Sequence, residues 1–120
     1  MRKKILCFDL DNTLCKTEGN NYKNSKPFKK KILLVNSLRQ KGYYIKIFTA
    51  RFMGRSQEKA SIAKKKGYIS TLKQLKSWNL MYDELIFGKP SFDILIDDKS
   101  LNFKHNWTRE LVKKIKKLKN

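Results

Sequence analysis

Side chains that could carry out phosphoryl transfer follow each of four short apolar runs along the chain. In chain order they are Asp9, Asp11, Thr49, Lys89, Asp97 and Asp98. Carboxylates crowded into one site repel one another and resist ionisation, and a hard divalent cation relieves that repulsion. Magnesium, held by one or two carboxylates together with a substrate phosphate, fits such a set. The pattern therefore predicts a magnesium-assisted site for phosphate chemistry, provided that the fold brings the four positions together.

The types and order of these residues suggest a role for each of them. Asp9, at the end of the first run, can attack phosphorus as a nucleophile. Asp11 could protonate the leaving oxygen and then take a proton from the water that completes hydrolysis. Thr49 and Lys89 would stabilise the charge on the transferring phosphoryl group. Taken singly, each residue could be a turn residue, a cap or a solvated charge, but together they favour a catalytic site.

The four apolar runs are predicted to be strands, because they are rich in β-branched and aromatic residues. They span residues 4–9, 43–48, 84–87 and 92–96. Helical segments separate the first three, which favours βαβ units and a parallel sheet. Ligands of such sheets bind beyond the carboxyl ends of the strands. The candidate side chains would then converge on one edge of the sheet.

Helices are predicted from the spacing of apolar residues and from their end signals. They are expected over residues 27–42, from Ser56 to Gly67, from Ser70 or Thr71 through Trp78, and from Asn106 to the C-terminus. The last of these would pack its apolar face on the core and turn its lysines to solvent, or bind a partner. Residues 14–26 are polar and turn-rich and are predicted to form a loop. The 120 residues are expected to form a single domain, residues 1–120.

The run Asp9-Leu10-Asp11-Asn12-Thr13 resembles the DxDx(T/V) first motif of the haloacid dehalogenase superfamily. Thr49, Lys89 and the pair Asp97-Asp98 match the second, third and fourth motifs of that family in order, and the resemblance covers about residues 4–103. It implies a three-layer Rossmann-like α/β fold, with helices on both faces of the parallel sheet. It also implies an aspartyl-phosphate intermediate and one Mg²⁺ ion.

Carried over by position, the resemblance assigns the metal ligands. Asp9 would be both nucleophile and ligand, Asp11 would bind the metal through its backbone carbonyl, and Asp97 would be the direct acidic ligand with Asp98 supporting it. An acid at the position of Asp11 is typical of the phosphatases and phosphomutases of the family, whereas the dehalogenases lack it.

The gaps between the motifs, residues 14–48 and 50–88, are too short for the cap domains that roof many family members. The chain thus resembles the capless branch, whose open site suits large substrates or small ones enclosed by a neighbouring subunit, as in a homo-oligomer. The runs Phe48–Arg51 and Gly88–Ser100 are similar to short phosphatases of bacterial capsule and surface-polysaccharide synthesis. That resemblance implies a phosphorylated sugar or related small metabolite, bound by Thr49, Ala50, Arg51 and Lys89. For Arg51 a solvated loop position is the alternative.

The formal charge of +19 leaves a second class of partner open. Such a charge suits a polyanion such as nucleic acid, and an AT-rich genome would produce the same excess of lysine. The chain has 24 lysines and 5 arginines, while surfaces that read phosphates and bases usually rely on arginine. A polynucleotide-end phosphatase and a non-catalytic binding module with a vestigial site are therefore the alternatives to a small-metabolite phosphatase.

No apolar run approaches the roughly 20 residues of a membrane helix, and the apolar stretch behind the basic start is interrupted at Asp9. A cytoplasmic protein without membrane partners is expected. Cys7 and Cys15 have no nearby histidine or cysteine partners and do not form a zinc site. The single histidine, His105, is expected to be structural or on the surface.

Overall fold

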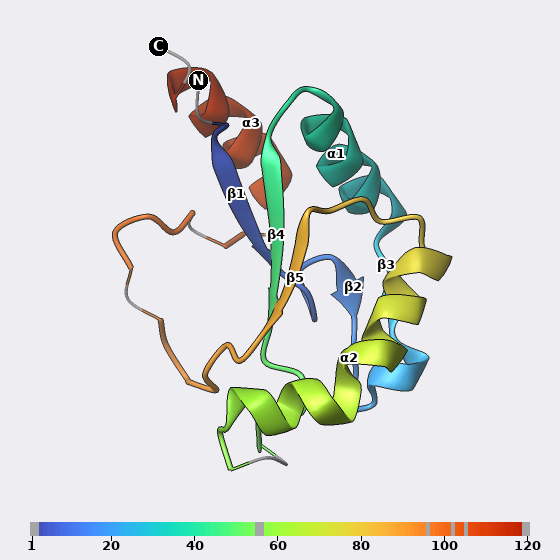
Figure 1. The fold of residues 1–120 in the computed structure, drawn as a ribbon. Coiled ribbons are helices and arrows are strands. Elements are labelled where there is room, and N and C mark those ends of the chain that lie inside the picture. The colour runs from blue at the N-terminus through green and yellow to red at the C-terminus, as the bar shows by residue number, and fades with distance from the viewer. Residues whose placement is uncertain (1–2, 55–56, 96, 102, 105, 119–120) are drawn as a thin grey trace.

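A three-stranded parallel sheet forms the centre of the molecule (Figure 1). The computed structural model describes residues 3–54, 57–95, 97–101, 103–104 and 106–118. The strands are β1 (Ile5–Asp9), β4 (Tyr44–Thr49) and β5 (Glu84–Phe87), in the order β1-β4-β5. The chain is therefore a small α/β fold, and three of the four predicted strands are confirmed to within a residue or two.

The two faces of this sheet differ in burial. Phe8, Ile47 and Leu85 lie side by side in register across the three strands, and all three are buried. Cys7 pairs with Lys46, which pairs with Glu84, and these side chains lie on the opposite face, where they are exposed or half-buried. Successive residues of a strand point to opposite faces, so the apolar alternation places the core on one side of the sheet.

The three helices all pack on that buried face. They are α1 (Lys29–Gln40), α2 (Ala60–Ser77) and α3 (Trp107–Leu118). The ring of Tyr68 in α2 lies 6.0 Å from that of Phe87, and the ring of Trp107 in α3 lies 6.1 Å from that of Phe8. Lys31 of α1 lies 5.6 Å from the Trp107 ring, which places α1 beside α3. The expected second layer of helices, on the other face, is not found in the part of the chain that the structure describes.

The helix α2 corrects the prediction of two helices in this region. Gly67, expected as a stop, lies inside one continuous helix, and Ser56 falls outside the described residues. A Cβ atom at Gly67 would collide with the ring of Phe52, so the glycine allows this aromatic side chain to press against the helix. Gly67 is needed here because a side chain packs closely against the helix, and not because the helix ends. The sequence pattern does not distinguish these two roles of glycine.

The expected fourth strand, residues 92–96, is likewise not formed by its described residues. Phe92, Ile94 and Leu95 belong to a long segment between β5 and α3, and all three are exposed. The composition of this run favours a strand, but a strand also needs a pairing edge, and its described residues pair with none. Figure 1 shows this segment, in orange, looping away from the sheet.

A small hairpin follows β1. It consists of β2 (Cys15–Lys16), the 3₁₀ turn η1 (Tyr22–Asn24) and β3 (Lys26–Pro27), and β2 pairs antiparallel with β3. We call residues 15–27 the flap. Its size agrees with the expectation of a short loop, although part of it is ordered as a hairpin. Among the described residues, no helix is long and apolar enough to cross a membrane.

Candidate active site

Asp9 and Lys89 meet at the carboxyl ends of the strands. The Lys89 ammonium nitrogen lies 3.2 Å from Oδ1 of Asp9, and the hydroxyl of Thr13 donates to Oδ2 at 3.2 Å. The Asp9 side chain is 35% exposed, whereas that of Lys89 is only 18% exposed. One carboxylate thus faces a cation and a hydroxyl and is still open to a ligand from solvent.

The backbone at the end of β5 brings Lys89 to this position. Gly88 has a φ of +103°, and a Cβ atom there would lie 2.5 Å from Cβ of Ala60 in α2. The N–H of Lys89 then donates to the carbonyl oxygen of Thr49 at 3.2 Å, across the end of β4. Because only glycine readily adopts this conformation, Gly88 lets the chain turn directly from β5 toward Asp9.

A tight turn after β1 positions Asp11. Asn12 has a φ of +62°, a left-handed conformation that asparagine tolerates better than most residues. Its N–H donates to the carbonyl of Cys15 at 2.6 Å, and its side-chain oxygen accepts the N–H of Thr17 at 3.1 Å. The turn folds the flap back over Asp11.

The carboxylate of Asp11 is paired with Arg51. The Arg51 Nε atom lies 2.9 Å from Oδ2 of Asp11, and Nη2 lies 2.8 Å from Oδ1. The hydroxyl of Thr17 donates to the same Oδ1 at 2.6 Å. Two-point contacts of this kind fix the orientation of a carboxylate as well as binding it.

The remaining donors of Arg51 also have protein partners. Nη1 donates to the side-chain oxygen of Gln74 at 2.7 Å and lies 3.4 Å from the hydroxyl of Thr71. The guanidinium lies 4.9 Å from the centre of the Tyr22 ring. The Arg51 side chain is 1% exposed. The expected contact between Arg51 and substrate does not agree with this arrangement, in which the guanidinium is enclosed by the protein.

Thr49 and Ala50 lie at the end of β4, as predicted. Thr49 is fully buried, and its hydroxyl accepts the N–H of Arg51 at 3.1 Å. Ala50 is half-buried and packs against the core. In this arrangement the Thr49 hydroxyl stabilises the turn that carries Arg51 and is shielded from solvent.

Asp97 and Asp98 are not brought to the site. Both are exposed, and Oδ1 of Asp97 accepts the N–H of Lys99 at 2.9 Å, as in a local turn. The described residues contain no group of three or more histidine, cysteine or acidic side chains placed to hold a metal. Among the described residues the expected ligand set of Asp9, Asp11, Asp97 and Asp98 is therefore not assembled, because those of the run before Asp97 form no strand.

Sequence reasoning missed several residues of the site. They are Thr13, Thr17, Ser25, Thr71 and Gln74. Thr13 belongs to the first motif and could have been assigned to Asp9. The others are polar residues of the flap and of α2, and their partners lie up to 52 positions away in the chain. No local pattern signals contacts of that kind.

The surroundings of the two cysteines disfavour the thiolate form. Burial raises the pKa of the Cys15 thiol, in spite of the hydrogen bond with Thr17 that acts in the opposite direction. Burial also raises the pKa of Cys7, although the nearby Lys46 opposes the shift. Both side chains therefore favour the neutral thiol, whereas the thiolate is the reactive form.

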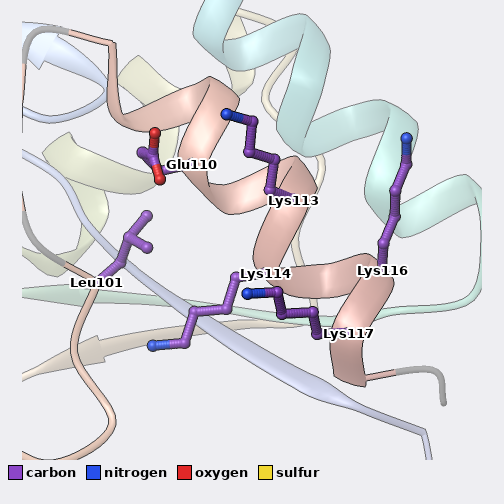
Figure 2. Close-up of a pocket in the computed structure, with 6 residues that line it drawn as sticks. All are labelled: Leu101, Glu110, Lys113, Lys114, Lys116 and Lys117. Atoms are coloured by element: carbon purple, nitrogen blue, oxygen red, sulfur yellow. The ribbon is translucent and has the colours of Figure 1, made fainter.

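Two surface hollows lie beside α3, away from these residues. Figure 2 shows one of about 530 Å³ beside α3, lined by Leu101, Glu110, Lys113, Lys114, Lys116 and Lys117. A second, of about 620 Å³, lies between α1 and α3 and is lined in part by Lys30, Lys31, Arg109 and Lys113. Neither of the two includes Asp9 or Asp11. Several lysines line both hollows, so part of the positive charge of the protein is concentrated there.

One solved structure is similar to the chain over nearly its whole length. It is the crystal structure of a structural-genomics target from Vibrio cholerae, with a TM-score of 0.76 and 26% sequence identity. The match covers 93% of this chain and 98% of that one. No protein-family model matches the sequence, and no curated protein matches it. The comparison supports the arrangement of the α/β fold.

Proposed function

We propose that the chain is a phosphomonoester hydrolase of the haloacid dehalogenase type, which acts through an aspartyl-phosphate formed on Asp9. The observation that carries the proposal is the position of Lys89, whose ammonium group lies 3.2 Å from a partly exposed Asp9 carboxylate. A lysine beside a carboxylate nucleophile attracts the phosphate dianion that the carboxylate alone would repel. Asp11, two residues along the same turn, supplies a second carboxylate.

The residues divide the reaction into two steps. In the first, an oxygen of Asp9 forms a bond to phosphorus and the bond from phosphorus to the ester oxygen breaks, while Asp11 gives a proton to the departing oxygen. In the second, water attacks phosphorus, Asp11 takes a proton from the water, and the bond from phosphorus to Asp9 breaks. Lys89 balances the negative charge of the phosphoryl group in both steps.

Magnesium is a separate part of the proposal. It rests on the resemblance to the family, which implies one Mg²⁺ ion. Of the four expected acidic ligands, Asp9 and Asp11 lie at the site, and Mg²⁺ commonly uses one or two carboxylates together with a substrate phosphate. Neither step above is routed through a metal. The Asp9 side chain is 35% exposed and that of Asp11 is 20% exposed, so the Asp9 carboxylate is the more open of the two to a metal.

The proposed substrate is a phosphorylated sugar or related small metabolite of surface-polysaccharide synthesis. The similarity of the segments around Thr49 and Lys89 to short capsule-associated phosphatases supports it. The small flap provides little cover for a substrate, and a neighbouring subunit of a homo-oligomer could supply more. A second candidate is a polynucleotide-end phosphatase, which is favoured by the lysines that gather on α3 (Figure 2).

Trapping of the covalent intermediate tests the proposed function. Wild-type protein mixed with an aryl phosphate and acid-quenched should carry a phosphoryl group on Asp9, detected by peptide mass spectrometry. Asp9→Asn should show neither the label nor turnover. Asp93→Asn, which changes an exposed carboxylate in the segment after β5, is the matched control and should retain both. Turnover by Asp9→Asn at the wild-type rate would refute the assignment. Folded protein that neither turns over nor labels would favour the binding-module alternative.

A further inference from the structure

Arg51 is the one charged residue that is buried in the described part of the chain. We propose that Arg51 is a positioning residue that couples the Asp11 carboxylate to the flap and to α2, and that it does not bind the substrate phosphate. The inference rests on the proposed function, in which Asp11 moves the protons. It replaces the expectation that Arg51 contacts substrate.

The first argument is that every nitrogen of the guanidinium already has a protein partner. Nε and Nη2 contact the two oxygens of Asp11, and Nη1 contacts Gln74. A phosphate could reach this group only if one of these hydrogen bonds broke, and a buried arginine that lost its carboxylate would be an uncompensated charge. The enclosed geometry thus favours a protein ligand over a substrate ligand.

The second argument is that the hydrogen bonds form a closed circuit through the flap. Thr17 donates to Asp11 at 2.6 Å and lies 2.6 Å from the hydroxyl of Ser25. Nη2 of Arg51 donates to the same Ser25 hydroxyl at 3.3 Å and to Asp11 at 2.8 Å. Asp11 is therefore held on one side by the flap itself and on the other by an arginine that also contacts the flap.

The third argument is that α2 anchors the same circuit. The Gln74 side chain accepts from Arg51 at 2.7 Å, and its NH₂ group donates to the carbonyl of Tyr22 at 2.8 Å. A movement of the flap would change the positions of Tyr22 and Ser25, and the rigid fork of Arg51 would pass that change to Asp11. Asp9 is outside this circuit, because its own partners are Lys89 and Thr13.

The kinetic consequence is that loss of Arg51 should impair the steps that need Asp11 and spare attack by Asp9. Arg51→Met should lower kcat for an alkyl phosphate by about 10²-fold, within the range that a positioned acid or base contributes. KM should change less than threefold, and phosphoenzyme should accumulate with an aryl phosphate, whose leaving group needs no proton. Arg51→Lys should rescue little, since an ammonium cannot make the two-point contact.

A double-mutant cycle separates positioning from other roles. Adding Arg51→Met to Asp11→Asn should cost no further rate, because both changes remove the same oriented carboxylate. Arg39→Met is the matched control: it breaks an arginine–carboxylate pair of 3.1 Å with Asp83, away from the site, and should leave the kinetics unchanged. A tenfold or larger rise in KM for every substrate, or additive losses in the cycle, would show that Arg51 binds phosphate and would overturn the proposal.

A measurement without turnover keeps this inference distinct from the proposed function. Amide hydrogen exchange of the flap should quicken in Arg51→Met and in Gln74→Ala, and the Arg51→Met change should have no added effect on top of Asp11→Asn. If Arg51→Met fails to fold, Gln74→Ala, which leaves Asp11 and Arg51 in place, gives the same readout with a smaller change. Unchanged flap exchange in both variants would refute the coupling, even in a protein that hydrolyses phosphate esters as proposed. Coupled exchange in a protein without phosphatase activity would refute only the proposed function.

Discussion

The Lys89 ammonium nitrogen lies 3.2 Å from the Asp9 carboxylate although the two residues are 80 positions apart in the chain, and their contact spans the end of the intervening strand β4. Both are polar side chains at the carboxyl edge of a parallel sheet, where α/β proteins place their ligands. The pairing leaves the Asp9 carboxylate partly exposed beside a more enclosed cation. That arrangement can receive a phosphate, and its cation is the first element to test.

Replacement of Lys89 should slow turnover while leaving the fold intact. Lys89→Met removes the charge that stabilises the transferring phosphoryl group, so kcat/KM for an aryl phosphate should fall about 10²–10³-fold, the usual effect of losing one such donor. Lys16→Met, which breaks an exposed pair of 3.9 Å with Glu18, is the matched control and should be neutral. A loss of less than threefold in Lys89→Met would show that the cation does not act on the phosphate.

Activity should depend on magnesium. Dialysis against a chelator should abolish aryl phosphate hydrolysis, and added Mg²⁺ should restore it, because a metal would offset the charge of Asp9 and the phosphate together. Mg²⁺ should also raise the Tm of the wild type and not that of Asp9→Asn, by linkage of binding to folding. Full activity in excess chelator would remove the metal from the mechanism.

The two candidate substrate classes should differ in their response to salt. A polynucleotide bound along several lysines should lose affinity with a log–log slope of about −0.7 per phosphate contacted on single strands. A small metabolite presents one phosphate to a partly enclosed site, so its kcat/KM should change only modestly over the same range. We expect the second behaviour. More efficient hydrolysis of a 3′-phosphorylated oligonucleotide near 0.15 M ionic strength, the physiological reference, would instead favour the polynucleotide-end phosphatase.

Gly67→Ala tests the continuity of α2. In an isolated helix, alanine is favoured over glycine by about 1 kcal/mol, but here the new Cβ atom would meet the ring of Phe52. We expect a net loss of about 1–3 kcal/mol in the free energy of unfolding, as for other overpacked positions. Gly54→Ala is the control, because a Cβ atom there has nothing within 4 Å. Denaturant unfolding that shows Gly67→Ala to be stabilising would contradict this packing.

The sequence patterns that predicted the fold correctly are those that depend on burial within one element. The alternation in β4 and the spacing of Ile32, Val35 and Leu38 in α1 both report a single buried face. The convergence of Asp9 and Lys89 then follows from parallel strand order alone. The role of Gly67 depended on Phe52, a residue outside its helix, and local periodicity carries no information about such a neighbour.

The site was predicted in part for the same reason. Asp9, Asp11 and Lys89 occupy strand ends or the turn that follows, positions that the sequence reveals directly. The predicted position of Arg51 at the end of β4 agrees with the structure, but its predicted contact with substrate does not. Its partners Gln74 and Asp11 come from α2 and from the turn after β1, and the sequence does not reveal them. Hydrogen bonds between side chains of different helices and strands cannot be predicted until the positions of those elements relative to one another are known.

The edge of β1 and the apolar segment after β5 affect how the protein behaves in solution. Among the described residues β1 pairs with β4 alone, so its other edge presents unpaired backbone groups. Phe92, Ile94 and Leu95, in the segment after β5, expose apolar surface. Unpaired edges and exposed apolar segments promote association between copies, whereas a charge of +19 keeps the copies apart. Salt screens that repulsion. The protein should therefore be least associated at low ionic strength and should begin to self-associate as ionic strength rises. Its binding to polyanions should instead weaken as ionic strength rises.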